Sequence, residues 1–355
     1  MSESECYSRL LDGRTVLDLS SLLPGPFVAT ILASMGASVV KVEHPSMPDS
    51  TAFSQFCGAP LKEEEVPSPG YSFLNRQKKI IRLEYSRGGG EDRRQFEKMV
   101  REAHACILHF RSATAEKLGV DDKSLHLLNP KLVIVKITGY PEPGTATAAS
   151  LGVSATTAAH DLNIQARLGL LSLTTQMIPL PVADLFAAYE GAVAVASAMD
   201  AVSRQGKSGI SISVSMYGAL RRAMGCFVEE FKERGETPAK RNSLFTGQFP
   251  CYRIYEAKCG QRVAVGALEP KFWSRLCKVM GLDELDGRGL ETGSEGEEVV
   301  QKVSSRFRER EWSEWGPLFK KADCCVEAAL SFEEAFGKGG TGGGGKARLA
   351  QSSRL

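Results

Sequence analysis

A repeated alternation of strand-like and helical segments dominates the first part of this chain. Residues 14–19 are strand-like, residues 27–35 have helical periodicity, Gly36 ends that helix, and residues 38–42 are strand-like again. A strand, a short helix and a second strand in this order predict a parallel sheet with right-handed crossovers. The segment contains no Gly-x-Gly-x-x-Gly motif, so we do not expect a dinucleotide site of that type.

The same alternation continues further along the chain. Additional strand-like runs lie at residues 74–83, 105–110, 132–137 and 210–214. A long alanine-rich helix is expected over residues 185–201. This rhythm predicts a doubly wound, Rossmann-like α/β domain with a parallel sheet, which we place at residues 1–224.

The pattern of predicted secondary structure changes after Phe249. Residues 252–255 and 261–266 resemble the two strands of a hairpin, and helical segments follow them. We therefore expect a smaller α+β domain over residues 225–335. The remaining residues, 336–355, are dense in glycine and should form a flexible tail.

The bulk composition narrows the class of protein. Hydrophobic residues make up 43% and charged residues 24% of the 355 residues, as in ordinary globular proteins. A net charge of +2 does not indicate a nucleic-acid-binding protein. No apolar run approaches the ~20 residues of a membrane span, so we expect none. The nine cysteines are scattered without a Cys-x-x-Cys pair, which favours reduced thiols inside a cell and predicts no metal site.

Both ends of the chain bear on its location. Residues 1–5 are acidic rather than apolar, so neither a signal peptide nor a transit peptide is expected. The final Ser353-Arg354-Leu355 is a conservative variant of the Ser-Lys-Leu peroxisomal address, and the glycine-rich residues 337–346 would expose it. We therefore expect the peroxisomal import receptor as a partner and the peroxisome as the location, with the cytoplasm or the mitochondrion as alternatives.

One histidine and three acidic residues form the candidate chemistry. His160 and Asp161 precede one apolar segment, and Asp184 precedes the long helix. A histidine titrates near neutral pH and can be oriented by a carboxylate, whereas backbone N–H groups at a helix start would hold Asp184. Glu269, further along the chain, completes the set of proton-transfer groups. Two such groups in different environments can hold opposite protonation states, so that one removes a proton from a carbon atom and the other returns one. Taken singly, each residue also has a structural interpretation, as a core or surface histidine, a helix cap or a surface charge.

Cations crowd the start of the strand-like run at residues 74–83. Arg76 and Lys78 in this position would suit a ligand that carries phosphate groups. A solvated basic turn explains the same residues at least as well, so both interpretations stay open here.

Several short motifs follow one another along residues 13–335. They are Val16-Leu17-Asp18-Leu19-Ser20, Pro24-Gly25-Pro26-Phe27, residues 36–43, Leu74-Asn75-Arg76 with Lys78, Phe110-Arg111, residues 116–119, and residues 129–133. In this order and number they resemble the family III CoA-transferase superfamily. Three further segments resemble the 2-methylacyl-CoA racemase branch of this superfamily: His160-Asp161 with Asn163, Ala183-Asp184, and residues 264–272.

The resemblance implies a racemase or epimerase. Such an enzyme interconverts (2R)- and (2S)-2-methylacyl-CoA thioesters by proton transfer through an enolate. The resemblance assigns His160, supported by Glu269, to one face of the reacting carbon and Asp184 to the other. Asp161 belongs to the same catalytic set, and backbone amides near Asp161 or Asp184 would stabilise the enolate oxygen.

The resemblance also implies how the substrate and the partner subunit would be held. CoA is part of the substrate, and neither a separate cofactor nor a metal is implied. Its phosphates would meet Arg76, Lys78, Arg111 and Lys117. His44 stands where an arginine is common near these phosphates, so it joins the candidate binding residues. The family also implies an interlocked homodimer.

Two other functions remain open. The first is a family III CoA transferase, in which Asp161 would be the nucleophile that accepts the acyl group. The second is a catalytically inactive, truncated paralogue that binds CoA esters, an alternative suggested by how soon the chain ends after residue 335.

Overall fold

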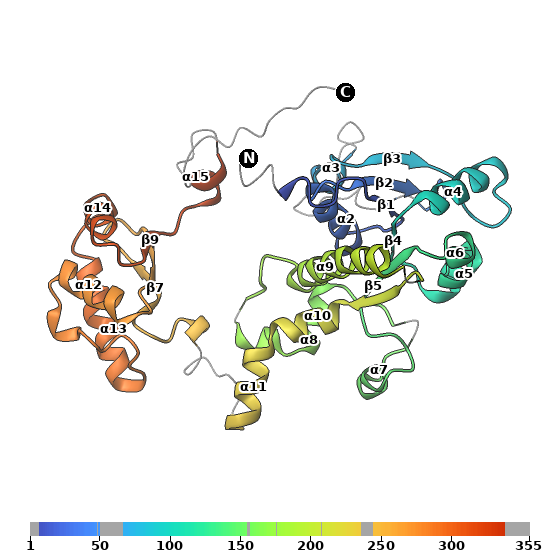
Figure 1. The fold of residues 1–355 in the computed structure, drawn as a ribbon. Coiled ribbons are helices and arrows are strands. Elements are labelled where there is room, and N and C mark those ends of the chain that lie inside the picture. Colours follow the sequence, from blue (N-terminus) through green and yellow to red (C-terminus); the bar gives the residue numbers. More distant parts are fainter. Residues whose placement is uncertain are drawn as a thin grey trace. The chain divides into compact units, whose positions relative to one another are not determined.

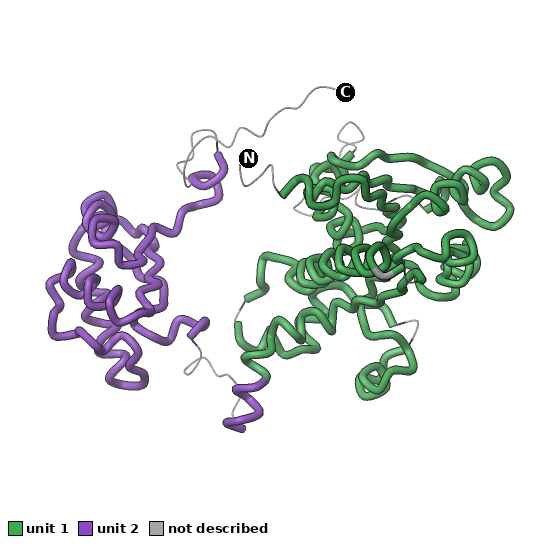
Figure 2. The backbone as a smooth tube through the Cα atoms, viewed as in Figure 1, with its two compact units in different colours: residues 1–228 green, residues 229–355 purple. Residues whose placement is uncertain are grey.

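The computed structural model places the described residues in two compact units, residues 1–228 and 229–355 (Figures 1 and 2). The described residues are 7–47, 49, 67–154, 157–174, 176–206, 208–235 and 244–337. The predicted glycine-rich tail beyond Gly337, the terminal Ser353-Arg354-Leu355 and the N-terminal residues 1–5 lie outside them.

A six-stranded sheet forms the centre of the first unit. Its strands are β1 (Thr15–Asp18), β2 (Ser38–Glu43), β3 (Lys79–Arg82), β4 (Ala105–Leu108), β5 (Val133–Thr138) and β6 (Ser211–Ser215). All neighbours are parallel and their order is β3-β2-β1-β4-β5-β6, so the order reverses between β1 and β4. The predicted doubly wound α/β fold is confirmed.

Helices cover both faces of this sheet (Figure 1). The described helices between Pro24 and Arg234 are α2 (Pro24–Ser34), α3 (Pro69–Asn75), α4 (Gly90–Glu102), α5 (Ser112–Leu118), α6 (Asp122–Leu128), α7 (Ala146–Leu151), α8 (Asp161–Arg167), α9 (Val182–Gln205), α10 (Met216–Ala223) and α11 (Gly225–Arg234), with a 3-10 helix at Leu170–Leu173. Of these, α7 and α11 extend away from the sheet (Figure 1). Side chains of a strand alternate between faces. Ala105 and Ile107 of β4 therefore join the core under α2, α8, α9 and α10, whereas Cys106 and Leu108 join the core under α4, α5 and α6.

Helix α9 is the longest helix among the described residues and is central to the first core. Its residues Val182–Arg204, with a mean hydropathy of 1.3, are long and apolar enough to cross a membrane, contrary to the expectation that no segment would be. However, Ala187, Ala188 and Val195 are buried in the core of the first unit. At Gly191 a Cβ atom would lie 2.8 Å from Cγ2 of Val28, so glycine permits the close approach of α9 to α2. Packing inside a folded core accounts for the composition of α9.

The second unit has its own sheet and its own core. Its elements are a 3-10 helix at Leu244–Thr246, β7 (Tyr252–Glu256), β8 (Arg262–Gly266), α12 (Pro270–Met280), a 3-10 helix at Asp283–Leu285, α13 (Gly293–Phe307), α14 (Trp312–Ala322), β9 (Val326–Ala328) and α15 (Phe332–Phe336). The strands are antiparallel in the order β7-β8-β9. The aromatic side chains Trp273, Phe307, Trp315 and Phe319 fill the core between the sheet and α12, α13 and α14. The hairpin predicted from the sequence is present as β7 and β8.

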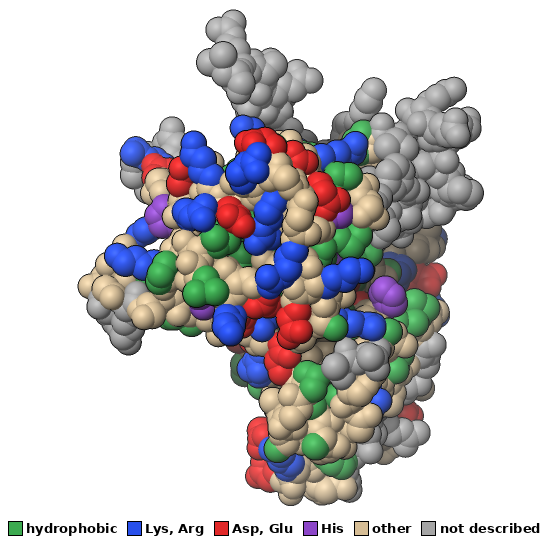
Figure 3. All heavy atoms as spheres, turned by 90° about the vertical axis from the view of Figure 1, so that its right-hand side faces the viewer, with side chains coloured by type: hydrophobic (Ala, Val, Ile, Leu, Met, Phe, Trp, Pro, Cys, Tyr) green, Lys and Arg blue, Asp and Glu red, His purple; other side chains and the backbone are tan. Residues whose placement is uncertain are grey.

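Charged side chains are interspersed on the surface. Figure 3 shows one face of the molecule on which Lys and Arg side chains alternate with Asp and Glu side chains. This mixture agrees with the nearly balanced net charge of +2.

Candidate active site

A cavity of about 330 Å³ opens at the carboxyl ends of β1, β4 and β5 in the first unit. This is the edge of the sheet where the strand order reverses, the place where doubly wound folds bind ligands. The cavity is lined by, among others, Ser21, His109, Arg111, Lys136 and His160. Of the residues predicted to act in chemistry or binding, His160 and Arg111 therefore line one cavity.

His160 is positioned by the start of α8. It is the N-cap residue of this helix, and its backbone N–H donates to Oδ1 of Asn163 at 3.0 Å. The backbone N–H of Asn163 in turn donates to the carbonyl oxygen of His160 at 3.0 Å. These two bonds hold the chain at the cavity wall, where the imidazole is exposed and accessible to a ligand.

Asp161 connects the starts of two helices. Its Oδ1 atom accepts hydrogen bonds from the backbone N–H groups of Ala183, at 2.6 Å, and Asp184, at 3.2 Å. Its Oδ2 atom accepts a hydrogen bond from the side-chain amide of Gln165. The sequence-based expectation that these amides hold the Asp184 carboxylate is therefore wrong. Asp184 lies inside the first turn of α9, after the position of a helix cap. The carboxylate of Asp161, on α8, accepts the hydrogen bonds of these backbone amides instead.

Asp184 is half-buried beside the Asp161 carboxylate. Burial, followed by the negative charge of Asp161, raises the pKa of Asp184 to about 7. Asp184 can therefore carry a proton near neutral pH, while Asp161 next to it is held by three hydrogen bonds. Carboxyl groups that differ in this way are suited to acid and base roles.

Gln165 is part of this arrangement and was missed by the sequence analysis. Its side chain is buried and donates to Asp161, which lies one helical turn earlier on α8. Its Oε1 atom is buried without a hydrogen-bond partner among the described residues. A glutamine four residues after an aspartate was the only signal in the sequence, and this spacing is common in helices.

Glu269 lies in the second unit. It is the N-cap residue of α12, followed by Pro270 in the first turn. Its carbonyl oxygen accepts hydrogen bonds from the backbone N–H groups of Phe272 and Trp273. The structure thus brings His160, Asp161 and Asp184 together at the starts of α8 and α9, whereas Glu269 belongs to the other unit.

Three of the predicted phosphate-binding residues have exposed side chains. Arg111 is the N-cap residue of α5 and lines the cavity, and Lys117 lies in the last turn of the same helix. Arg76 follows α3, with its guanidinium carbon 5.3 Å from the centre of the Phe73 ring. Among the described residues no acidic group forms an ion pair with any of the three, so each can meet an anion.

Lys78 does not fit the predicted contact with phosphate. Its side chain is fully buried, and its ammonium group donates to Oδ2 of Asp18 at 2.8 Å and to the carbonyl oxygen of Pro26 at 2.8 Å. An ammonium group enclosed in this way has no open path to a ligand, so Lys78 has a structural role.

His44 does not fit the predicted contact either. Its Nε2 atom lies 2.7 Å from Oε1 of Glu84 and 2.8 Å from Oγ of Ser86. Its Nδ1 atom lies 2.9 Å from Oγ of Ser46. Because the ring is buried and both nitrogen atoms have partners, His44 stabilises the turn after β2.

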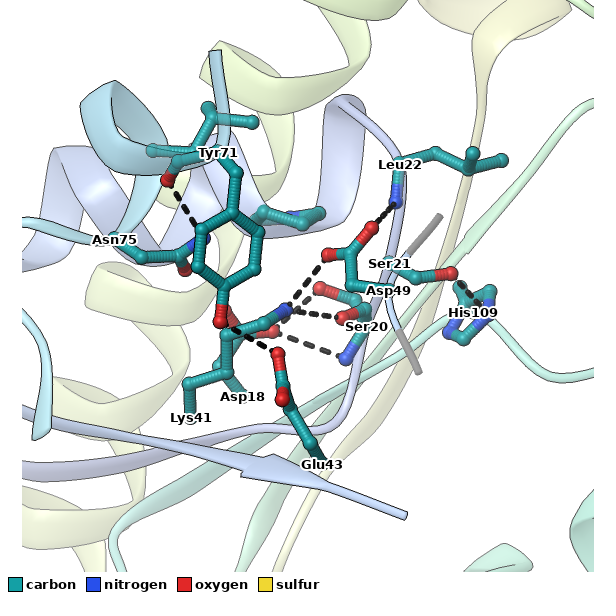
Figure 4. Close-up of polar contacts among 12 residues, drawn as sticks. Asp18, Ser20, Ser21, Leu22, Lys41, Glu43, Asp49, Tyr71, Asn75 and His109 are labelled. Carbon is teal, nitrogen blue, oxygen red and sulfur yellow. Dashed lines mark hydrogen bonds and ion pairs between the residues drawn. The ribbon is translucent and has the colours of Figure 1, made fainter. Parts of the chain in front are cut away.

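A buried polar network surrounds the turn after β1, whose residues Ser21 and Leu22 line the cavity (Figure 4). The ammonium group of Lys41 donates to the carbonyl oxygen of Ser20 at 2.8 Å and to Asp49 at 3.0 Å. Asp49 in turn accepts from the backbone N–H of Leu22, a residue with a positive φ of 68°. Although burial raises the pKa of Asp18, Lys78 and Lys41 hold it far below its usual range. The network thereby fixes the strained turn that follows β1 at the edge of the cavity.

Ser21 and His109 were also missed by the sequence analysis. Oγ of Ser21 lies 2.9 Å from Nε2 of His109, and both residues line the cavity at the reversal of strand order. Within the described part of the chain, no cluster of three or more His, Cys, Asp or Glu side chains could hold a metal ion.

The fold and the cavity together define an α/β protein with a ligand site at the reversal of strand order and a His-Asp-Asp arrangement beside it. The chain matches the model of CoA-transferase family III over residues 11–341 and therefore belongs to this family.

Relatives of both reaction types are similar to this chain. A CaiB/baiF CoA-transferase family protein of Caenorhabditis elegans is 28% identical, over 92% of this chain and 87% of the relative. The alpha-methylacyl-CoA racemase of Mus musculus is 28% identical, over 92% of this chain and 79% of the relative. The succinyl-CoA:mesaconate CoA-transferase of Haloarcula marismortui is 30% identical, over 85% of this chain and 74% of the relative. The family is thus one of acyl-CoA enzymes, and its members include racemases as well as CoA-transferases.

Solved structures share the fold. A CAIB/BAIF family protein from Brucella suis superposes with a TM-score of 0.73 at 23% identity, covering 91% of this chain and 85% of that protein. A protein of Mycobacterium tuberculosis superposes with a TM-score of 0.72 at 21% identity, covering 92% and 85%. At this level of identity the superpositions bear on the fold alone.

Proposed function

We propose that this protein is a racemase that inverts the carbon next to the thioester of a 2-methylacyl-CoA. The observation that carries the proposal is the pairing of Asp161 and Asp184 beside His160. The pKa of Asp184 is raised to about 7, whereas Asp161 accepts hydrogen bonds from two backbone amides of α9 and from the side-chain amide of Gln165. A 1,1-proton transfer needs one base that accepts a proton and a second group that donates one, and His160 and Asp184 supply this pair.

In the proposed mechanism the two groups act on opposite faces of the carbon. His160 removes the proton from one enantiomer, and protonated Asp184 returns a proton from the other side. In the reverse direction the roles exchange. Asp161 contributes by its charge, which helps Asp184 to keep its proton at neutral pH.

The enolate oxygen needs hydrogen-bond donors other than the first amides of α9. The N–H groups of Ala183 and Asp184 donate to Asp161 and are therefore occupied. The proposal requires no cofactor besides the CoA of the substrate, whose phosphates would meet Arg76, Arg111 and Lys117.

A CoA transferase is the competing function, since transferases are among the relatives at up to 30% identity. It would need Asp161 as a free nucleophile. Both oxygen atoms of Asp161 accept hydrogen bonds, and an attack would break its bonds to the start of α9. We therefore favour the racemase.

Location and assembly are parts of the same proposal. The terminal Ser353-Arg354-Leu355 supports import into peroxisomes by the receptor that reads such tripeptides. The family resemblance supports a homodimer.

One experiment separates the candidate functions. The protein is incubated with a single enantiomer of a 2-methylacyl-CoA in heavy water, and deuterium at C2 and optical purity are followed. The racemase should incorporate deuterium and lose optical purity. Transfer of CoA to an added carboxylic acid without exchange at C2 would instead support the transferase, and bound but unchanged thioester would support the inactive paralogue.

Variants tie the reaction to the site. His160→Ala and Asp184→Ala should each lower racemisation by at least about 10²-fold, the usual contribution of a general acid or base. Asp200→Ala is the matched control, because Asp200 lies on the same helix as Asp184, is exposed and pairs with Arg204 at 2.7 Å. Wild-type rates in either site variant would contradict the assignment.

A further inference from the structure

A second cavity lies at the opposite edge of the sheet in the first unit. Its volume is about 330 Å³, and it is formed at the amino ends of β1, β4 and β5 and by the last turns of α9. Ligands of the reaction are expected at the carboxyl ends of these strands, so the proposed racemase chemistry makes no use of this cavity. Its lining is strongly cationic.

Three cations face a single carboxylate in this lining. Arg14, Arg101 and Lys131 line the cavity together with Glu102. Among the described residues no ion pair within 4.0 Å involves Arg14, Lys131 or Glu102, whereas Arg101 pairs with Glu97 at 3.5 Å. The lining of the cavity therefore has an excess of positive charge, which favours the binding of an anion.

His104 adds a neutral hydrogen-bond donor. Its Nδ1 atom accepts a hydrogen bond from the backbone N–H of Thr15 at 3.1 Å, so in the neutral ring the proton is on Nε2. Burial, and then the charge of Arg14, lower the pKa of His104, so the ring is neutral at physiological pH. The backbone of His104 also bonds to Thr15 and Val133, which makes this part of the wall rigid.

Backbone carbonyl groups near the cavity are satisfied, so Glu102 is the main group in the described lining that would repel an anion. The carbonyl oxygens at the end of α4 carry partial negative charge, but the side-chain amide of Asn129 donates to those of Val100, at 2.9 Å, and Ala103, at 2.8 Å. The Ser203 hydroxyl lies 3.2 Å from the Arg14 guanidinium and adds a polar group at the rim. Donors thus dominate the polar part of the cavity.

We propose that this cavity is a second binding site, separate from the catalytic edge, for a small phosphate monoester. Arg14, Lys131 and the Nε2–H of His104 bind the phosphate group, which as a dianion matches the two unpaired cations. Val133, Met199 and Val202 are buried side chains in the lining and receive the short organic part of the ligand. The volume exceeds that of inorganic phosphate and lies at the lower end of small-molecule sites.

The test is a calorimetric titration of the full chain with inorganic phosphate and with phenyl phosphate at constant ionic strength. Both probes should bind, and phenyl phosphate should bind more tightly because its ring covers the apolar part. Arg14→Gln and Lys131→Gln should each weaken both probes about tenfold or more, as expected for a hydrogen bond to a charged group. Lys98→Gln, which removes an exposed charge elsewhere on α4, is the matched control and should change binding by less than about twofold.

A parallel titration with dephospho-coenzyme A, which carries no phosphate monoester, shows which edge of the sheet is involved. Arg14→Gln and Lys131→Gln should keep the dephospho-coenzyme A affinity of the wild type, which also demonstrates that they are folded. The proposal is overturned if the wild type binds neither phosphate probe at about 10 mM, a concentration that detects even weak affinity. It is equally overturned if both variants bind the phosphate probes like Lys98→Gln, or if they lose dephospho-coenzyme A and phosphate affinity together. Failure of the racemase assay would leave these outcomes unaffected.

Discussion

Asp161 and Asp184 are the same amino acid in unlike surroundings. Asp161 receives hydrogen bonds from the start of α9 and from Gln165, whereas Asp184 faces burial and the charge of its neighbour. Burial and the neighbouring negative charge favour the neutral form of Asp184. The division of roles between the two residues therefore arises from their positions rather than from their chemistry.

The raised pKa of Asp184 predicts how stability depends on pH. The folded state binds this proton up to about pH 7, whereas an unfolded aspartate releases it near the ordinary value of 3.8. Stability from this group is therefore present at low pH and is lost as pH rises toward 7. Between pH 5 and 8 the wild type should lose roughly 2 kcal/mol of unfolding free energy relative to Asp184→Asn.

The measurement is urea unfolding at several pH values, followed by circular dichroism. Asp200→Asn serves as the control because Asp200 is exposed on the same helix. A difference between wild type and Asp184→Asn that stays constant from pH 5 to 8 would show that the pKa of Asp184 is not raised.

At the scale of elements, buried polar contacts from the segment after α3 and from β2 hold the end of β1 in place at the site. Lys78 follows α3 and crosses to Asp18 on β1, while Lys41 on β2 holds the turn at Ser20. Each contact joins residues that are far apart in the chain, and all are buried. This network explains why Lys78, one of the cations for which the sequence suggested a phosphate contact, instead stabilises the fold.

Removal of the buried cation predicts a large loss of stability. Lys78→Met should lower the unfolding free energy by about 3 kcal/mol or more, because Asp18 would keep a buried charge with fewer partners. Lys79→Met changes the exposed neighbour on β3 and should cost less than about 0.5 kcal/mol. Equal unfolding midpoints for the two variants in urea would refute a structural role for Lys78.

The elements themselves were predicted unevenly. Strands β1, β2, β4, β5 and β6 and helices α2, α4 and α9 follow from apolar periodicity over several residues. The short elements α3, α7 and β9 were missed. In α3 the Ser68 side chain accepts from the Tyr71 backbone N–H and Pro69 begins the helix, so Leu74 and Asn75 end a helix rather than begin the strand expected over residues 74–83. Met224 separates the consecutive helices α10 and α11.

At the scale of the whole molecule, the two units have separate cores. The buried residues of the second core that the structure describes run from Cys251 to Val326 and include Trp273 and Trp315. All three tryptophans of the chain lie in this unit, so tryptophan fluorescence reports on it alone.

The separate core predicts independent folding of the second unit. A fragment of residues 244–337 should unfold cooperatively in urea, followed by tryptophan fluorescence. Phe307→Ala should destabilise the fragment by about 3–5 kcal/mol, because Phe307 is fully buried among aromatic rings. Phe332→Ala removes an exposed ring and is the control. A fragment that shows no cooperative transition would mean that the core depends on the first unit.

The sequence by itself determined the class of fold and the motifs from which the site is built. Periodic apolar residues, glycines at helix ends and short motifs are local features, so they can be recognised without knowledge of distant contacts. Tertiary structure alone decided that Asp161 caps α9, that Asp184 holds its proton near neutral pH, and that Lys78 is buried. Burial, ion pairing and hydrogen bonding depend on residues brought together from different parts of the chain, and these interactions set the charge and availability of each side chain.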